Sequence, residues 1–269
     1  MLKIDKETRY AIIVFPDQDN GLKAQRVLVS RGIDFKAIST LAVAVPEGSR
    51  QEACRSIIAE KAHISGHYPF LYRDYEEDFF KRAQEYKAPA VKDEFLKTIT
   101  LCYVAPCMAD VKKIRLIAYF DRDISEVLPY LNATLKGASY NKRGSTLTYA
   151  RDGVIINLYA IKIAIAKAND IIHAWALLDE VKRCINDVYE RRDAITPSFD
   201  EKVKVTALQI YGWLPKTNCK LCGEATCLAF ALKLLLGEQK LKNCEPLFTD
   251  AKSAENKIIL QEMMETLGL

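Results

Sequence analysis

Four of the eight cysteines of this 269-residue chain lie within 26 residues near its C-terminus. They are Cys219, Cys222, Cys227 and Cys244, spaced C-x2-C-x4-C-x16-C. Cysteine thiolates are the usual ligands of iron–sulfur clusters, and three thiolates on one loop can occupy three corners of a cubane. A fourth thiolate that returns after one helix closes the set. We therefore predict that these four side chains bind a 4Fe-4S cluster and that the protein acts in redox chemistry.

The residues between the four cysteines fit a cluster-binding loop followed by a helix. Gly223 gives the loop the backbone freedom to turn amide groups toward cluster sulfides. Thr226 is placed to cap a helix that begins near Cys227 and runs to Leu236. Gly237 is expected to end this apolar helix, so that the last cysteine can fold back toward the first three.

A tetrahedral zinc site is the main alternative, since four cysteines with one C-x2-C pair also suit zinc. Zinc is disfavoured because 16 residues separate Cys227 from Cys244, where a second C-x2-C knuckle would be expected. Two disulfide bridges are a weaker alternative, because eight cysteines in a chain that is not secreted point toward metal binding or thiol chemistry.

The segment Leu214–Leu247 resembles a known iron–sulfur domain family. The residues that carry the resemblance are Leu214-Pro215, Thr217-Asn218-Cys219, Cys222-Gly223, Thr226-Cys227, Ala229-Phe230 and Cys244. Such domains occur at the N-terminus of the corrinoid iron–sulfur protein large subunit and in the B subunit of the Rnf complex. The resemblance implies one 4Fe-4S cluster on the same four cysteines, used in low-potential electron transfer. In the corrinoid case the electron restores an inactive cobalt centre, so a redox partner protein, corrinoid-related, is implied as well.

Two further resemblances concern the rest of the chain. Ile114–Arg192 is similar to the body of iron–sulfur-binding proteins of anaerobic bacteria and archaea that end in this same domain. The first 66 residues resemble small sulfur-carrier-like domains, but in those domains a cysteine lies near the third strand, where this chain reads LAVAVP. Because Cys54 is expected on the following helix instead, no sulfur-carrier role is inferred.

The other four cysteines are scattered along the chain, at Cys54, Cys102, Cys107 and Cys184. Cys102 and Cys107 could bind a second metal or form a redox pair. Two buried packing residues are the preferred interpretation, since a free cysteine behaves as a small hydrophobe. Cys54 and Cys184 are expected on helices, as core or partly exposed residues without a chemical role.

Two histidines and a group of lysines are further candidates. His63 and His67 are four residues apart, but Ser65-Gly66 interrupts the helix on which they could act together as metal ligands. His173 is expected to pack or to cap the start of a helix. Five lysines surround the cysteine motif and could together steer an acidic redox partner, although each alone is most simply a solvated side chain: Lys216, Lys220, Lys233, Lys240 and Lys242.

The composition is that of a globular protein, with 49% hydrophobic residues. A formal charge of +4, from 39 basic and 35 acidic residues, is too small for a dedicated nucleic-acid binder, so no nucleic-acid partner is expected. The N-terminus does not resemble a signal peptide and no apolar stretch is long enough to cross a bilayer. We therefore expect a cytoplasmic location and no membrane insertion.

Alternating strand and helix patterns predict an α+β (α/β) protein: two small sheet-and-helix units followed by a small, mostly helical 4Fe-4S domain. In the first unit we expect a strand over Tyr10–Phe15, a helix over Gly21–Arg31, two short strands around Phe35–Val45 and a helix over Arg50–Lys61. One or two helices are expected in the segment that follows, residues 67–110.

The second unit is expected to begin with a strand at Ile114 and a helix over Ser125–Leu135. Asp152-Gly153 predicts a hairpin turn, because this pair tolerates positive φ angles. One long strand over Val154–Ala166 and a helix capped by Asn169 or Asp170 should follow, the helix running to about Arg192. The last helices are expected over Glu201–Tyr211, in the cysteine motif and over Thr249–Leu269.

These elements together predict four parts of the chain. They are a small α/β domain over 1–66, a helical connector over 67–110, a ferredoxin-like α+β domain over 111–200 and the cluster domain with its C-terminal helix over 201–269.

These patterns favour a protein of electron transfer or reductive activation, in which a cluster passes an electron to a partner or bound cofactor. A non-catalytic redox or oxygen sensor is the alternative, and an accessory component of corrinoid metabolism is a third possibility. No Ser-His-Asp set, paired-carboxylate motif, Walker loop or GxGxxG is found, so the sequence does not decide whether the protein is an enzyme. Any catalysis would have to come from the cluster or from a cofactor that no motif reveals.

Overall fold

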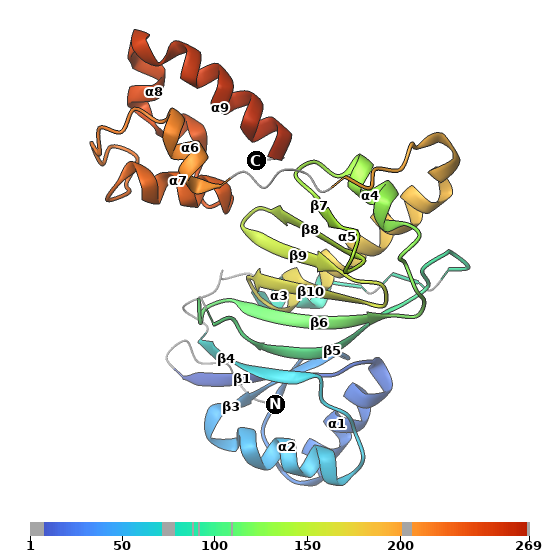
Figure 1. The fold of residues 1–269 in the computed structure, drawn as a ribbon. Helices are drawn as coiled ribbons and strands as arrows, with labels where there is room; N and C mark the ends of the chain where they lie inside the picture. The colour runs from blue at the N-terminus through green and yellow to red at the C-terminus, as the bar shows by residue number, and fades with distance from the viewer. Residues whose placement is uncertain are drawn as a thin grey trace. The chain divides into compact units, whose positions relative to one another are not determined.

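The computed structural model divides the chain into two units, each built around its own strands. The first unit comprises Met1–Asp123 and Ile161–Tyr189, and the second comprises Ile124–Ala160 and Glu190–Leu269. The structure describes residues 8–71, 79–87, 89–90, 92–108, 110–200 and 206–267. Strands and helices together confirm the predicted α+β class (Figure 1).

The elements of the first unit alternate between strands and helices. Its strands within the described residues are β1 (Arg9–Val14), β2 (Lys36–Ser39), β3 (Ala42–Pro46), β4 (Gly66–Leu71), β5 (Ile99–Pro106), β6 (Ile114–Phe120) and β10 (Lys162–Ala168). Its helices there are α1 (Gln18–Ser30), α2 (Arg50–Ala59), α3 (Phe79–Glu85) and α5 (Ile171–Glu190).

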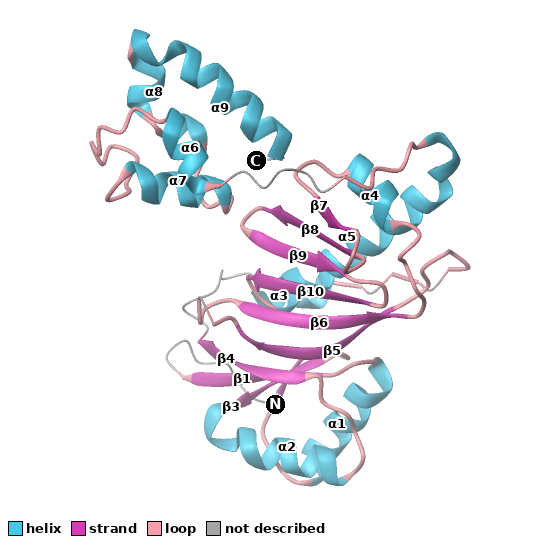
Figure 2. Ribbon diagram, viewed as in Figure 1, coloured by secondary structure: helices cyan, strands magenta, loops and turns pink. Residues whose placement is uncertain are grey.

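The second unit holds a short meander and most of the remaining helices. Its strands within the described residues are β7 (Ser139–Asn141), β8 (Thr146–Arg151) and β9 (Val154–Leu158). Its helices there are α4 (Leu128–Thr134), α6 (Ala207–Trp213), α7 (Cys227–Leu235), α8 (Glu245–Thr249) and α9 (Ala254–Leu267). From Thr206 onward the described chain contains helices and loops only (Figure 2).

In the first unit the strands are ordered β2-β3-β1-β4-β5-β6-β10. Neighbouring strands of this unit pair antiparallel, except that β4 and β5 pair parallel at Gly66 and Val104. Gly66 has φ +154°, and a Cβ at this position would lie 2.1 Å from the Val104 carbonyl oxygen. Only glycine permits this approach of the two backbones.

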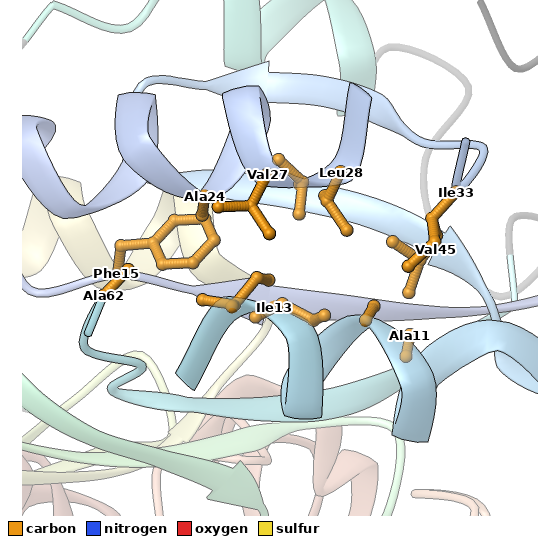
Figure 3. Packing of buried hydrophobic residues seen from close by; sticks show 12 residues of the cluster. Ala11, Ile13, Phe15, Ala24, Val27, Leu28, Ile33, Val45 and Ala62 are labelled. Atoms are coloured by element: carbon orange, nitrogen blue, oxygen red, sulfur yellow. The ribbon is translucent and has the colours of Figure 1, made fainter. Parts of the chain in front are cut away.

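Helices cover both faces of β1, which explains why its sequence is almost continuously apolar. Ala11 and Ile13 lie in a buried cluster with side chains of α1 and α2, among them Leu28 (Figure 3). On the opposite face Ile12 pairs in register with Tyr68 of β4, whose hydroxyl accepts a 3.3 Å hydrogen bond from the Ile171 N–H at the start of α5.

In the second unit β7, β8 and β9 form an antiparallel meander. Asp152 and Gly153 have φ of 49° and 78°, and they connect β8 to β9 as the Asp-Gly pair predicts. The expected helix over Ser125–Leu135 is present as α4, although it begins at Leu128.

The structure differs from the sequence-based expectation in three places. Residues 67–110 supply the expected helix, α3, but also most of β4 and all of β5. The long strand expected over Val154–Ala166 is two strands, β9 and β10, separated by Tyr159–Ile161. The C-terminal helix expected from Thr249 begins only at Ala254, as α9, and a separate short helix, α8, ends at Thr249.

Several helix ends agree with the sequence signals. Asp170 caps α5, since its Oδ1 accepts a 2.8 Å hydrogen bond from the His173 N–H. Residues 201–205 of the helix expected over Glu201–Tyr211 lie outside the described residues, and the described remainder is helical from Ala207.

Among the described residues, no helix combines the length and the apolar character needed to cross a membrane.

Candidate metal centre

The four clustered cysteines line one small cavity in the second unit. Cys219 and Cys222 lie on the loop between α6 and α7, Cys227 is the first residue of α7, and Cys244 directly precedes α8. Cys219 is exposed, Cys222 is half-buried, and Cys227 and Cys244 are buried. The thiols therefore run from the surface to the interior of this part of the chain.

The loop before α7 is held in an unusual backbone conformation. Lys216, Asn218, Lys220 and Gly223 have φ values of 60°, 50°, 63° and 83°. Each left-handed residue other than glycine costs about 1–2 kcal/mol. Residues of this kind, alternating with right-handed ones, turn successive N–H groups into a concave nest that favours negative charge. Strain of this sort is concentrated at functional sites.

Asn218 fastens this loop to the start of α7. Its Oδ1 accepts a 2.8 Å hydrogen bond from the Cys227 N–H, and its own N–H lies 3.4 Å from the Cys227 Sγ. The side chain thus fixes the distance between the first and third cysteines of the motif. Asparagine also tolerates the left-handed conformation better than most residues.

The N-terminus of α7 presents Cys227 to the cavity. Thr226 caps the helix, since its Oγ1 accepts a 3.1 Å hydrogen bond from the Ala229 N–H, as predicted. Gly237, with φ 70°, follows the last turn of α7 and lets the chain return toward Cys244.

A polar network ties the cysteine loop to the segment after α7. Glu224 Oε1 lies 2.9 Å from Lys233 Nζ and 2.8 Å from Gln239 Nε2, and Gln239 Nε2 also donates to the Cys222 carbonyl oxygen at 3.3 Å. The hydrogen bond from Lys233 lowers the pKa of Glu224 below its usual value. Lys233 is therefore paired, so it does not belong to the uncompensated lysines around the motif.

The two outer cysteines have opposite electrostatic environments. A hydrogen bond from the Leu221 backbone, and then one from the Thr217 side chain, lower the pKa of the Cys219 thiol. Burial raises the pKa of the Cys244 thiol above its usual value. A bound cation would oppose this shift, because positive charge favours the thiolate form.

The donor set fits an iron–sulfur cluster. Four thiols line one cavity, and two of them lie on the loop that holds the left-handed residues. In a cubane each thiolate binds a different iron, so the ligands surround the cluster. Among the described residues, no three His, Cys, Asp or Glu side chains converge closely enough to hold one single metal ion, whereas the ligands of a cluster are spread around it.

The remaining cysteines do not join this site. Cys102 is exposed on β5 and Cys107 is buried just after it. Only Cys107 therefore agrees with the expected packing role. Partial burial of Cys102 raises the pKa of its thiol. Cys54 packs half-buried against the core of the first unit, and Cys184 is half-buried on α5.

The histidines have local structural contacts. His67 Nε2 lies 3.2 Å from Arg50 Nη1, and burial followed by the Arg50 charge lowers the pKa of His67. His63 is exposed, and its backbone N–H donates to Asn20 Oδ1. His173 Nδ1 accepts a 3.2 Å hydrogen bond from the Asn169 N–H, consistent with the predicted capping role.

Sequence reasoning missed three residues that shape the site: Asn218, Glu224 and Gln239. For Asn218 a signal was present, since asparagine before the first cysteine is suited to a left-handed loop position. For Glu224 and Gln239 the contacts depend on how far the chain folds back after α7, which residue spacing does not reveal.

Comparison with known proteins identifies the segment that holds the site. Residues 214–246 match a family model described as "Putative Fe-S cluster". The chain is 44% identical over 61 residues to the acetyl-CoA decarbonylase/synthase complex subunit gamma of Methanocaldococcus jannaschii, covering 23% of this chain and 12% of that protein. It is 51% identical over 47 residues to the corrinoid/iron-sulfur protein large subunit of Moorella thermoacetica, covering 18% of this chain and 10% of that protein.

The chain thus spans only about an eighth of the length of the curated relatives it matches. No solved structure matches the chain. The resemblance predicted for the C-terminal segment is confirmed, because both the family model and the relatives point to it. Residues 214–246 therefore form an iron–sulfur cluster domain of this family.

Proposed function

We propose that Cys219, Cys222, Cys227 and Cys244 ligate one 4Fe-4S cluster. The observation that carries the proposal is that these four thiols line a single cavity inside the segment that matches the iron–sulfur family. We further propose that residues 201–269 act as the cluster domain. The domain boundaries proposed for the rest of the chain divide it into residues 1–66, 67–110 and 111–200.

The protein uses this cluster for low-potential electron transfer or reductive activation in anaerobic metabolism. When bound, a 4Fe-4S cluster accepts and releases one electron at a time. The residues of this chain control where the electron enters and leaves. Cys219 is exposed, and the Leu221 side chain beside it is 63% exposed, so the loop at Cys219–Leu221 is the edge of the site nearest to solvent.

The partner is a redox protein, corrinoid-related, that docks at this edge. By name the relatives are subunits of an acetyl-CoA decarbonylase/synthase complex and a corrinoid/iron-sulfur protein. The exposed apolar side chain of Leu221 directly follows the exposed Lys220 in the chain, and Lys216 on the same loop is exposed as well. An apolar contact with a basic rim suits a partner that presents an acidic rim.

Substitution of Cys222 tests the ligand set. Wild-type protein purified without oxygen should contain about four iron and four sulfide per chain and show the paramagnetic resonance signal of a reduced cubane. The Cys222→Ala variant should lose most of the iron and this signal. Cys102→Ala, which removes a cysteine outside the cavity, is the matched control and should match the wild type. Full iron content in Cys222→Ala, or one zinc per wild-type chain, would reject the assignment.

Measurement of the reduction potential of the cluster distinguishes electron transfer from the alternative function, which is oxygen or redox sensing. For electron transfer we expect a midpoint potential near that of plant-type ferredoxins, about −400 mV, and rapid electron exchange with a low-potential donor. The exposed position of Cys219 is the observation that favours sensing, because oxygen could reach the cluster there. Partner binding that changes with cluster oxidation, without electron exchange, would establish sensing instead.

A further inference from the structure

The first unit contains a cavity of about 150 Å³ whose lining includes none of the four clustered cysteines. One wall is a face of α5, with Trp175, Leu178, Asp179 and Lys182 at helical spacing. The start of β5 also lines the cavity, with Ile99 and Leu101. Most of the lining is apolar, with a few polar groups, which is the usual character of a small-molecule site.

Lys182 is the polar group of this cavity whose bonding is least complete. The residue is only 8% exposed, and its Nζ lies 3.8 Å from Glu94 Oε2, too far for a hydrogen bond. Glu94 Oε2 already accepts a 2.8 Å hydrogen bond from Asn186 Nδ2. An ammonium has three N–H donors, and burying it is costly unless they are used. Within the described part of the chain, no protein acceptor lies within hydrogen-bonding distance of this ammonium.

The acidic group of the cavity is already engaged. Asp179 Oδ2 accepts a 2.8 Å hydrogen bond from the Tyr86 hydroxyl, and the Tyr86 ring stacks on Trp175 with centroids 5.1 Å apart. Burial raises the pKa of Asp179, and the hydrogen bond from Tyr86 opposes that shift. The second lysine of the lining, Lys97, is paired with Asp93 at 2.6 Å. Lys182, whose ion pair with Glu94 is long at 3.8 Å, is therefore the cation of the lining with donors left for a ligand.

The volume limits the size of a ligand. A cavity of about 150 Å³ accommodates a single benzene ring, whereas sites for drug-sized ligands measure about 300–1,000 Å³. A nucleotide or a corrinoid does not fit. The Trp175–Tyr86 stack and Leu178 provide flat and apolar surface for one ring or a branched aliphatic body.

We propose that this cavity binds a small monocarboxylate with a single-ring or similarly sized apolar body. Its carboxylate accepts hydrogen bonds from the Lys182 ammonium, and its body packs against Trp175 and Leu178. The site would give the first unit a ligand-binding role of its own, independent of the cluster.

Fluorine NMR with two matched probes tests the proposal on the full chain. 4-Fluorobenzoate should bind saturably, and 4-fluorobenzylamine, of the same size but opposite charge, should bind at least about tenfold more weakly. Lys182→Met should weaken 4-fluorobenzoate binding at least about tenfold, because a charge-assisted hydrogen bond is lost. Lys81→Met removes a lysine that is 76% exposed on α3, and it should bind the probe as the wild type does.

Three results would overturn the proposal: no saturable binding of 4-fluorobenzoate, equal binding of the amine, or unchanged binding by Lys182→Met. If Lys182→Met does not fold, Leu178→Phe serves in its place, because it fills the cavity and leaves the lysine intact. Loss of 4-fluorobenzoate binding in folded Leu178→Phe supports the site, and unchanged binding refutes it.

Discussion

Asn218 combines two properties that the cysteine loop needs in one residue. Its φ of 50° lies in the left-handed region, and its side chain accepts the hydrogen bond of the Cys227 N–H. The first property directs the loop, and the second joins it to α7. A substitution can remove one property or both, so the two contributions can be measured separately.

Asn218→Ala should destabilise the cluster domain by about 2 kcal/mol, since it removes a partly buried hydrogen bond and leaves a strained left-handed alanine. Asn218→Gly should cost about 1 kcal/mol, because glycine relieves the strain but not the lost acceptor. The rate of iron loss to a chelator, with the thermal unfolding temperature, measures both effects. Asn157→Ala is the matched control, since the Asn157 side chain accepts a hydrogen bond from Thr148 on an exposed surface outside the cluster domain. Equal iron loss from all three variants would show that Asn218 has no special role.

Elements with a strong local signal could be predicted from the sequence, and elements that depend on distant partners could not. The amphipathic pattern and the Asp170 cap predict α5 closely, and the Asp-Gly pair predicts the turn between β8 and β9. The strand β4 was missed because Pro69 interrupts its pattern. Pro69 is accommodated because β4 pairs with β5 only at Gly66, so that its missing N–H breaks no ladder there.

Two glycines in helices show how tertiary contacts decide whether a change from glycine to alanine stabilises or destabilises the protein. Gly21 lies in α1, and a Cβ there would be 1.7 Å from the Thr40 carbonyl oxygen. Gly212 lies in α6, and a Cβ there would meet no atom within 4 Å. Helix propensity alone favours alanine at both positions by up to about 1 kcal/mol.

We expect Gly21→Ala to destabilise the protein by about 1–3 kcal/mol, because the backbone around Thr40 must move. Gly212→Ala should instead stabilise it by about 0.5–1 kcal/mol, since nothing opposes the helix preference. Denaturant unfolding followed by circular dichroism measures both, with each variant serving as the control of the other. Stabilisation by Gly21→Ala would show that α1 does not approach Thr40 this closely.

At the scale of the whole chain, the cysteine motif was the part of the site that spacing could predict. Spacing alone identified the four thiols and the helix that separates the last two. It did not reveal that Lys233 is neutralised by Glu224, or that the first unit holds a cavity around Lys182. Both depend on residues more than eight positions apart in sequence that folding brings together.

The cluster domain and the core around β1 differ in how many of their buried residues are candidate metal ligands. The cluster domain has a core of ten buried residues within its described part, and two of them are Cys227 and Cys244. The core around β1, α1 and α2 contains no candidate ligand among its twelve buried residues. Small domains with few core residues commonly rely on a bound metal for stability.

Removal of iron by a chelator should therefore loosen the cluster domain and leave the first unit folded. Hydrogen exchange should become faster over residues 206–249. Without iron, the core residues Cys227 and Cys244 would have no metal bond and would be left as buried thiols or as thiolates that repel each other. Exchange in β1, β4 and β6 should be unchanged, and Cys102→Ala treated in the same way should reproduce the wild-type pattern. Faster exchange in β1 after iron removal would contradict this view, since it would mean that the cluster stabilises the chain as one cooperative structure. Unchanged exchange over 206–249 would show that the helices around the cysteines are stable without the cluster.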